Sequence, residues 1–474
     1  MRRTRTVALL TLALINVFTL AAGVAVARML PARLAALKVP TIAAAQVRAA
    51  APVLGTDSDG AMPTASGLQS ALSGPLSASA LGSPVAAVVT DPATGRVLWS
   101  QNPDQLATPA STTKLATSLA ALALLGPDAR FTTKVVQGAS PDRIILVGGG
   151  DPTLAVNAYP SQDYPQPATL AGLAAATASK LKAEHRTKVS LDYDTSLYSG
   201  PDLAPGWSQS YVSTGDVTPI SSLEVDQGRL DKSGNPEDSD DPYNLRPRSE
   251  DPADVAADAF ADLLNQDGID LTQYTEEQAA PAHAATIASV SSPPLSAIVA
   301  QMLEESNNVI AENLARHVAL AAGKPASFSS AAGAEITELR RLGVTTGIHL
   351  VDGSGLSPQD GIAPATLVKV IELAMADSRL RPLLAGLPVA GFSGTLSAGQ
   401  SVFAGISGAA LGSVRAKTGN LGTVTALAGT VADKSGSTLA FAFMADRIPS
   451  AGLLDQAADA IDGAAAALAN CGCQ

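Results

Sequence analysis

Two pairs of short apolar runs, one near each end of the chain, predict β-hairpins. Residues 85–90 and 96–100 are apolar and β-branched runs separated by a turn that contains proline and glycine. Residues 424–431 and 438–444 repeat this arrangement around a polar turn. Short runs of this kind bounded by turn residues are typical of β-strands. Strands from both ends of the chain indicate one sheet that the two termini complete.

Apolar stretches of helical character accompany these hairpins. They occupy residues 115–125, 295–321, 363–376 and 452–468. The first of them ends at Gly126 and Pro127, a pair that stops a helix. Helices packed beside an antiparallel sheet predict a fold of the α+β class.

The pattern changes in the middle of the chain. Residues 131–288 alternate short apolar runs with clusters of Pro, Gly, Asp and Ser. This alternation differs from the helical periodicity that follows it. We therefore predict an inserted domain, or domains, over residues 131–288. Residues 79–130 and 289–469 are then two parts of one interrupted domain.

The N-terminal segment has the pattern of an export signal. Arginines at positions 2, 3 and 5 precede an uncharged run over residues 7–27, which is long enough to span a bilayer. Ala25-Val26-Ala27 also offers a small-residue cleavage site. Residues 1–28 are thus predicted to be a signal peptide or a retained anchor, and the two alternatives stay open. Either one places the remainder outside the cytoplasm, on the membrane face or in the wall. The Ala-, Pro- and Ser-rich residues 29–78 are predicted to be a linker.

Composition excludes several classes of function. The chain has 31 basic and 43 acidic residues, which give a net charge of −12 and no basic footprint for nucleic acid. Its four histidines are isolated from one another, so no metal site is predicted. The tail, residues 470–474, carries Cys471 and Cys473, which could form a small disulfide or a short metal-binding motif. We favour a solvent-exposed terminal clip without a catalytic role.

The first candidate for chemistry is Ser111-Thr112-Thr113-Lys114, at the start of an apolar helix. Residues three apart lie on one helix face, so Lys114 would stand beside Ser111. A lysine desolvated on the apolar side of a helix can lose its proton and activate a serine hydroxyl. The alternative is a serine that only caps the helix, with Lys114 exposed. A second match to the same spacing, Ser179 and Lys182, lies among charged residues and is interpreted as a solvated face.

Two further short motifs follow in the second half of the chain. Ser306-Asn307-Asn308 interrupts a helical segment, where it could be an exposed turn or a set of hydrogen-bonding groups aimed into a cleft. Lys417-Thr418-Gly419 precedes a predicted strand, and Gly419 would allow a substrate backbone to approach closely. The alternative for Lys417 is a surface lysine on an edge strand.

Taken in order, the three motifs resemble those of serine penicillin-binding proteins and β-lactamases. The long separation of Ser111 from Ser306 is similar to that of the penicillin-binding protein 4 type, the D-alanyl-D-alanine carboxypeptidases/endopeptidases. Residues 148–154 and 352–357 also resemble that family. The resemblance implies a β-lactamase/transpeptidase-like domain, an antiparallel sheet with flanking helices, that a large inserted domain interrupts.

The resemblance implies a role for each motif residue. Ser111 would attack the carbonyl between two terminal D-alanines, and Lys114 would accept its proton. Ser306 would relay a proton to the leaving D-alanine, and Asn308 would hold the peptide and orient Lys114.

The third motif would recognise the chain end of the substrate. Lys417 and Thr418 would bind the terminal carboxylate, and the N–H groups of Ser111 and Asn420 would form the oxyanion hole. The mechanism needs neither metal nor cofactor. The implied partners are peptidoglycan stem peptides that end in D-Ala-D-Ala and β-lactam antibiotics, with the membrane reached only through the N-terminal segment.

Three other readings compete with this one. A β-lactamase would need a carboxylate that activates water, and no clear counterpart is found. A non-catalytic wall-binding or sensory protein would not need all of the motif residues. A general esterase would not need Lys417 and Thr418 poised for a carboxylate. Carboxypeptidase and endopeptidase preference are left undecided.

Overall fold

The computed structural model describes residues 60–158, 165–237, 246–273, 276–398 and 410–473. The apolar run at residues 7–27 therefore lies outside the described residues. Within the described part of the chain, no helix combines the length and the apolar character needed to cross a membrane.

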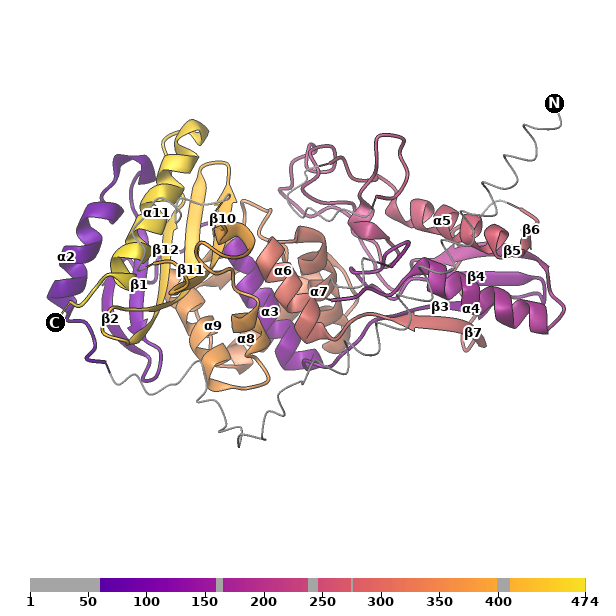
Figure 1. The fold of residues 1–474 in the computed structure, drawn as a ribbon, viewed down its shortest axis with the longest axis horizontal. Helices are drawn as coiled ribbons and strands as arrows, with labels where there is room; N and C mark the ends of the chain where they lie inside the picture. Colours follow the sequence, from indigo (N-terminus) through magenta and orange to yellow (C-terminus); the bar gives the residue numbers. More distant parts are fainter. Residues whose placement is uncertain (1–59, 159–164, 238–245, 274–275, 399–409, 474) are drawn as a thin grey trace, which may run out of the picture. The chain divides into compact units, whose positions relative to one another are not determined.

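A five-stranded antiparallel sheet joins the two ends of the described chain (Figure 1). Its strands, in spatial order, are β10 (Val414–Leu421), β11 (Val424–Ala432), β12 (Thr438–Ala445), β1 (Ala86–Asp91) and β2 (Arg96–Gln101). β1 pairs with β12, so that Val88 lies opposite Ala442. The prediction of one sheet completed by both hairpins is confirmed, and β10 adds the strand that carries the Lys417 motif.

The two faces of this sheet pack against different helices because side chains alternate along each strand. Small residues such as Ala440 and Ala442 face a helical layer. The layer consists of α3 (Thr113–Leu125), α6 (Leu295–Glu305), α7 (Asn308–Ala321), α8 (Phe328–Arg341), α9 (Pro364–Ala376) and α10 (Pro382–Ala385). Phe441 and Phe443 face the other side, toward α2 (Ala65–Leu76) and α11 (Leu454–Ala469). The helical layer buries α3, at whose start Ser111 lies.

Helix α2 corrects the prediction that residues 29–78 are a linker. Thr64 caps the helix by accepting a hydrogen bond from the Gly67 N–H, at 3.1 Å. Leu68, Leu72 and Leu76 point into the core shared with α11. Leucines four apart form one apolar stripe along a helix. The Ala, Ser and Gly residues between them give the segment the composition of a linker and hide this stripe in the sequence. Residues 60–78 thus belong to the folded domain, whereas residues 29–59 lie outside the described part.

We expect Leu72→Ala to destabilise the protein although it lies in the segment predicted to be a linker. Leu72 is fully buried, and deleting a buried leucine costs about 2–5 kcal/mol. The measurement is the urea midpoint of the full chain, followed by circular dichroism. Ser73→Ala, on the exposed side of the same helix, is the control. Equal midpoints for the two variants would mean that α2 does not contribute to the core.

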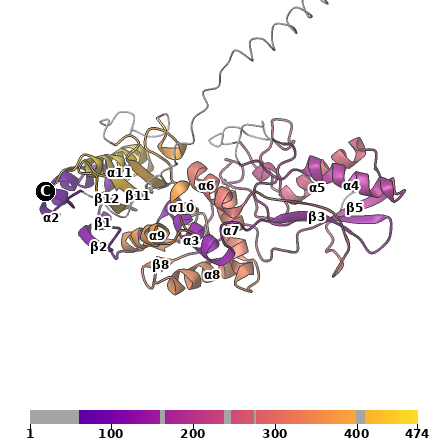
Figure 2. The same ribbon diagram turned by 60° about the horizontal axis from the view of Figure 1, so that its bottom comes forward.

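The inserted region forms a second five-stranded sheet (Figure 2). Its strands, in spatial order, are β6 (Asp270–Leu271), β5 (Lys188–Asp194), β4 (Arg143–Val147), β3 (Thr132–Gln137) and β7 (Thr286–Ser291). Helices α4 (Leu170–Ala183) and α5 (Pro252–Gln266) pack on it around Phe260 and Leu173. The strands extend from residue 132 to residue 291, close to the predicted limits 131–288.

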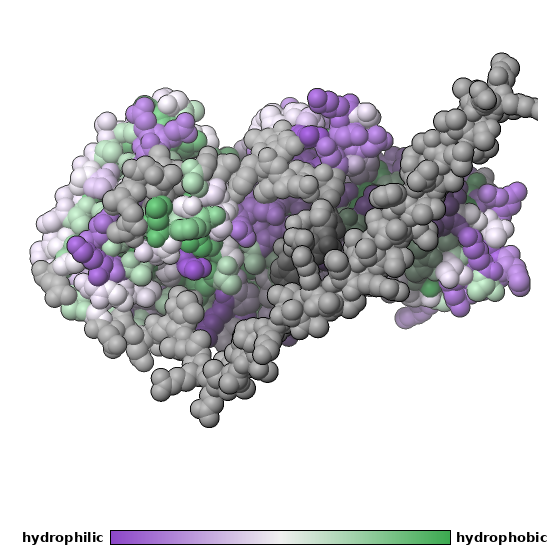
Figure 3. Space-filling view, viewed as in Figure 1, coloured by the Kyte–Doolittle hydropathy of each residue, from purple (hydrophilic) through white to green (hydrophobic). Residues whose placement is uncertain are grey.

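The second match to the Ser111 spacing lies on α4. Ser179 and Lys182 are both exposed, as expected for a solvated face. Figure 3 shows hydrophilic residues at the end of the molecule where α4 lies. No nucleophile is predicted there.

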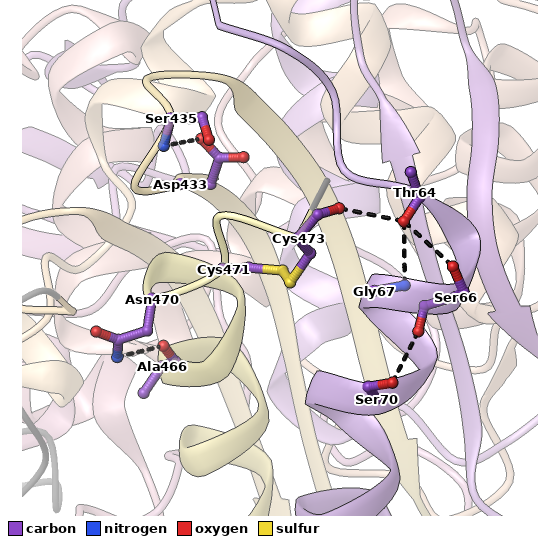
Figure 4. The surroundings of a disulfide bond; sticks show 10 residues. All are labelled: Thr64, Ser66, Gly67, Ser70, Asp433, Ser435, Ala466, Asn470, Cys471 and Cys473. Carbon is purple, nitrogen blue, oxygen red and sulfur yellow. Dashed lines mark hydrogen bonds between the residues drawn. A yellow bond between two sulfur atoms is a disulfide. The ribbon is translucent and has the colours of Figure 1, made fainter.

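The cysteine tail is less exposed than predicted. Cys471 and Cys473 form a disulfide, and Cys471 is buried against α11 (Figure 4). The Cys473 carbonyl accepts a hydrogen bond from the Thr64 N–H at 2.7 Å. The tail is therefore a contact with the start of α2 rather than a solvent-exposed clip, a contact that the sequence near the C-terminus does not reveal.

Candidate active site

Ser111 lies in a single 3-10 turn, Ala110–Thr112, that leads into α3. Two glycines allow the chain to surround this turn. A side chain at Gly355 would lie 1.9 Å from the Ala110 carbonyl oxygen, and one at Gly419 would lie 2.6 Å from the Pro109 carbonyl oxygen. Ala110 itself has a φ of 46°, a strained value for alanine. The backbone at Ser111 is thus enclosed by the 352–357 loop and by β10.

Lys114 is fully buried, and its amine contacts three oxygens. Nζ lies 2.9 Å from Ser111 Oγ, 2.7 Å from Asn308 Oδ1 and 2.8 Å from the Ser354 carbonyl oxygen. Burial lowers the pKa of Lys114 to about 7, although the charges of Asp352 and Glu312 oppose this shift. A neutral amine has two N–H donors and one lone pair. The two carbonyl oxygens can accept both donors, which leaves the lone pair for the Ser111 hydroxyl.

The Ser354 carbonyl is positioned by two buried carboxylates. Glu312, on α7, accepts hydrogen bonds from the N–H groups of Gly353 and Ser354, at 2.8–3.1 Å. Asp352 accepts from Gly355 at 2.6 Å and from the Trp207 indole at 2.7 Å. These bonds hold the 352–357 loop in a conformation in which the Ser354 carbonyl faces Lys114.

Glu312 also influences proton binding at the site. Burial, followed by the charge of Asp352, raises the pKa of Glu312 to about 7. Asp360, beside the same loop, has its pKa raised to about 10 by burial and then by Asp352. Burial and the charge of Asp352 thus favour the protonated forms of Asp360 and Glu312, while burial favours the neutral form of Lys114.

The Ser306-Asn307-Asn308 motif lies between α6 and α7. Ser306 ends α6 with a φ of 58°, in the left-handed region, and Asn307 caps α7 by accepting from the Ile310 N–H at 3.1 Å. Asn308 Nδ2 donates to the Asp216 carbonyl at 2.9 Å, so its Oδ1 faces Lys114. The sequence alternative of an exposed turn is wrong for Asn307, which is buried.

Lys417 links the second and third motifs. Its Nζ donates to Ser306 Oγ at 2.8 Å and to the Thr418 carbonyl at 2.9 Å, and the residue is fully buried. The alternative of a surface lysine is therefore wrong. The Thr418 hydroxyl lies 2.8 Å from the Thr395 hydroxyl. Burial and then the charge of Lys114 lower the pKa of Lys417 well below its usual value.

Asn420 follows the motif on β10, opposite Thr425 of β11. Its side-chain oxygen accepts from the Thr425 hydroxyl at 2.8 Å. Gly419 is the residue that lets β10 approach Ser111, because a side chain there would lie 3.2 Å from the Ser111 nitrogen. The third motif and the Ser111 turn are thereby neighbours.

The inserted domain contributes hydrogen-bond acceptors to Asn307 and Asn308 of the second motif. Besides the Asp216 carbonyl, it supplies Gln227, whose Oε1 accepts from Asn307 Nδ2 at 2.6 Å and from Arg229 Nη1 at 2.7 Å. Gln227 has a φ of 56°, an unfavourable conformation that these contacts maintain.

Sequence reasoning missed several residues of the site. Glu312, Ser354, Asp216 and Gln227 were not predicted to act there. Ser354 lies within residues 352–357, which resembled the family, so a signal existed for it. Asp216 acts through its backbone carbonyl, for which no residue type is a signal.

If Lys114 accepts the Ser111 proton, as the resemblance to serine penicillin-binding proteins implies, the rate of Ser111 acylation is expected to rise with pH through about 7, because Lys114 must be neutral to do so. In Glu312→Gln the charge that favours protonated Lys114 is gone, so the rising limb should move to lower pH. The measurement is the pH profile of the rate constant for acylation by benzylpenicillin. Glu184→Gln, at the exposed end of α4, serves as control. A limb that stays in place or moves to higher pH in Glu312→Gln would contradict this assignment.

Nothing in the described residues suggests a metal centre. Among residues 60–158, 165–237, 246–273, 276–398 and 410–473, no group of three or more His, Cys, Asp or Glu side chains is arranged to hold a metal ion.

Comparisons with known proteins agree with the motif pattern. The sequence model of the D-Ala-D-Ala carboxypeptidase 3 (S13) family matches residues 68–246 and 226–468. Carboxypeptidase DacB of Mycolicibacterium smegmatis is 38% identical over 427 residues, which are 89% of this chain and 88% of that protein. A carboxypeptidase of Mycobacterium tuberculosis is 36% identical over 420 residues, 87% of this chain and 86% of its own length.

A solved structure shares the fold. The crystal structure of penicillin binding protein 4 from Haemophilus influenzae superposes with a TM-score of 0.65 at 24% sequence identity. The match covers 81% of this chain and 93% of that one. The expected α+β fold, a transpeptidase-like domain with a large insertion, is thereby confirmed.

Proposed function

The chain belongs to the D-Ala-D-Ala carboxypeptidase 3 (S13) family, and on that premise we propose that Ser111 is the nucleophile through which it removes the terminal D-alanine of cell-wall peptides. It is a serine D-Ala-D-Ala carboxypeptidase. The observation that carries the assignment is the buried Lys114 amine, 2.9 Å from Ser111 Oγ, with both of its N–H groups accepted elsewhere.

In the acylation step, Ser111 Oγ forms a bond to the carbonyl carbon of the penultimate D-alanine. Lys114 takes the hydroxyl proton. The backbone N–H groups of Ser111 and Asn420 donate hydrogen bonds that stabilise the negative charge on the carbonyl oxygen. Each such donor typically contributes about 3–4 kcal/mol to the transition state. Asn308 keeps its amide oxygen on Lys114 because the Asp216 carbonyl holds the other end of that amide.

Collapse of the tetrahedral intermediate breaks the peptide bond. The proton held on Lys114 must reach the departing nitrogen, and Ser306 is the relay that we assign to this transfer. Its hydroxyl is held by Lys417 at 2.8 Å. Water then attacks the acyl-enzyme and releases the shortened peptide. In a cross-linked peptide the departing nitrogen is that of the cross-link, and the same steps, ending with water, make D,D-endopeptidase activity a second outcome of this geometry.

The third motif suits an anionic chain end. The Thr418 and Thr395 hydroxyls lie 2.8 Å apart, and the Lys417 amine donates to the Thr418 carbonyl at 2.9 Å. A substrate carboxylate is an opposite charge, so its binding raises the pKa of Lys417 and favours the protonated form. β-Lactams carry an equivalent carboxylate beside a strained amide, and we propose that they acylate Ser111. The H. influenzae penicillin binding protein 4 has been crystallised in complex with a β-lactam.

We further propose that the chain acts outside the cytoplasm. The support is the arginine-flanked uncharged run at residues 7–27, which is either a signal peptide or a membrane anchor. Fractionation of cells that express the tagged full chain tests this proposal. Recovery from the cytosolic fraction would overturn it.

Release of D-alanine from diacetyl-lysyl-D-alanyl-D-alanine by the full chain tests the main proposal. We expect release, and its loss after pre-treatment with benzylpenicillin. A cross-linked peptide dimer assayed in parallel distinguishes the endopeptidase outcome. A folded chain that binds benzylpenicillin but neither releases D-alanine from the first substrate nor splits the dimer into monomers would contradict the assignment.

A further inference from the structure

Asp360 is a buried acid at the base of the 352–357 loop. It is 2% exposed, and its Oδ1 accepts a hydrogen bond from the Val351 N–H at 2.6 Å. Strand β9 (Gly361–Ile362), which follows directly, is hydrogen-bonded to Ala107 in the segment before the first motif. Asp360 therefore lies where two segments that border the active site meet.

Asp352, the neighbour of Asp360, is a buried carboxylate with a full set of donors. Three backbone N–H groups of its own loop and the Trp207 indole donate to its two oxygens at 2.6–3.1 Å. Each oxygen accepts two of these four bonds. Hydrogen bonds of this kind favour the charged form of a carboxyl group, so Asp352 is the ionised member of the pair.

The carboxyl groups of Asp360 and Asp352 are hydrogen-bonded to each other. Two carboxylates are acceptors only and repel each other, so this bond requires a proton. Asp352 already has donors on both oxygens, whereas Asp360 Oδ2 is buried and receives no hydrogen bond from the described residues. Burial and then the charge of Asp352 raise the pKa of Asp360 to about 10. The proton of the pair therefore lies on Asp360.

The other titratable groups around this pair are mostly acidic. Glu312, on α7, acts on Asp360 through its charge. Burial, followed by the charge of Glu312, raises the pKa of Glu335, on α8, well above its usual value, and Asp352 adds to this shift. His349, on the strand that pairs with β9, is exposed. Like charges in such a group favour neutral carboxyl groups, which agrees with a protonated Asp360.

We propose that Asp360 is a positioning residue that acts as a neutral acid and shares its proton with Asp352. The shared proton holds the loop whose Ser354 carbonyl contacts the Lys114 amine. A hydrogen bond from a carboxyl group to a carboxylate is roughly twice as strong as one between neutral groups. An ionised Asp360 would instead repel Asp352 and favour the protonated form of Lys114, which cannot accept a proton. The inference rests on the proposed acylation of Ser111.

Carbon-13 NMR of the full chain, labelled at the aspartate Cγ atoms, tests the proton without reference to turnover. The resonance that disappears in Asp360→Asn should lie, at neutral pH, at the chemical shift of a protonated carboxyl group. Asp360→Leu removes the same resonance and assigns it if the asparagine variant does not fold. Asp262→Asn, exposed on α5, is the control and should remove a resonance at the carboxylate position. An Asp360 resonance at the carboxylate position would overturn the proposal.

The rate constant for acylation by benzylpenicillin, measured against pH, tests the positioning role. Asparagine can accept from Val351 and donate to Asp352, so Asp360→Asn should react nearly as fast as the original chain, with the rising limb in place. Leucine has a similar volume but forms neither bond, and Asp360→Leu should react about tenfold more slowly.

Three results of this measurement would refute the positioning role. A limb that moves to lower pH in Asp360→Asn would show that Asp360 is ionised in the original chain. Equal rates for the asparagine and leucine variants, whether both fast or both slow, would show that the shared proton does not hold the loop. A chain that benzylpenicillin does not acylate at all would contradict the proposed function instead, and the NMR measurement would still decide the state of Asp360.

Discussion

Replacing Ser111 with alanine is expected to lower D-alanine release on the order of 10⁴-fold or more, the largest effect of any single substitution in this protein. The reason is chemical. In the proposed mechanism Oγ is the atom that forms the acyl bond, and the Lys114 amine, held by Asn308 and Ser354, lies 2.9 Å from it. A water molecule in place of the hydroxyl would lack the fixed position that makes the attack effectively intramolecular.

The measurement combines D-alanine release with mass spectrometry after exposure to benzylpenicillin. Ser111→Ala should lose both the release and the mass increase of the acyl-enzyme. Ser179→Ala is the matched control, because Ser179 has the same spacing from a lysine but lies exposed on α4. Acylation that persists in folded Ser111→Ala would assign the nucleophile to another residue.

Replacing Lys114 with methionine is expected to slow acylation by about 10²–10⁴-fold, the range of a lost general base. Methionine keeps an unbranched side chain in the buried position but removes the lone pair. Lys114→Arg separates two roles, since arginine keeps the N–H donors but is always protonated. If Lys114 acts as the base, both variants are slow.

The rate constant for acylation by benzylpenicillin is the appropriate measurement, because it isolates the first step. Lys182→Met, the exposed lysine of the second match on α4, should react at the unaltered rate. Lys114→Arg that reacts nearly as fast as the original chain would show that Lys114 acts through charge and hydrogen bonds rather than as a base.

Local patterns in the sequence predicted the elements that carry the motifs. The hairpins at 85–100 and 424–444 and the helix after Ser111 depend on side-chain period and turn residues, which are properties of neighbouring positions. The break at Ser306 was visible for the same reason. Residues 60–78 were interpreted wrongly because three leucines among small residues form a stripe that gains meaning only when α11 packs on it.

The protonation state of the site was decided by the tertiary structure. A lysine three residues after a serine is either a solvated cation or a buried base, and the difference is set by α7 and the 352–357 loop, distant in sequence, that enclose Lys114. Backbone carbonyls of Asp216 and Ser354 complete the site, and every residue type carries such a group.

The sequence by itself therefore determined the order of the elements, the three motifs and the family, because these depend on residue types and their spacing. Which groups contact the Lys114 amine, and that Lys417 is buried, were decided only by the fold. Burial and hydrogen-bond partners are properties of segments brought together by packing, and no local pattern encodes them.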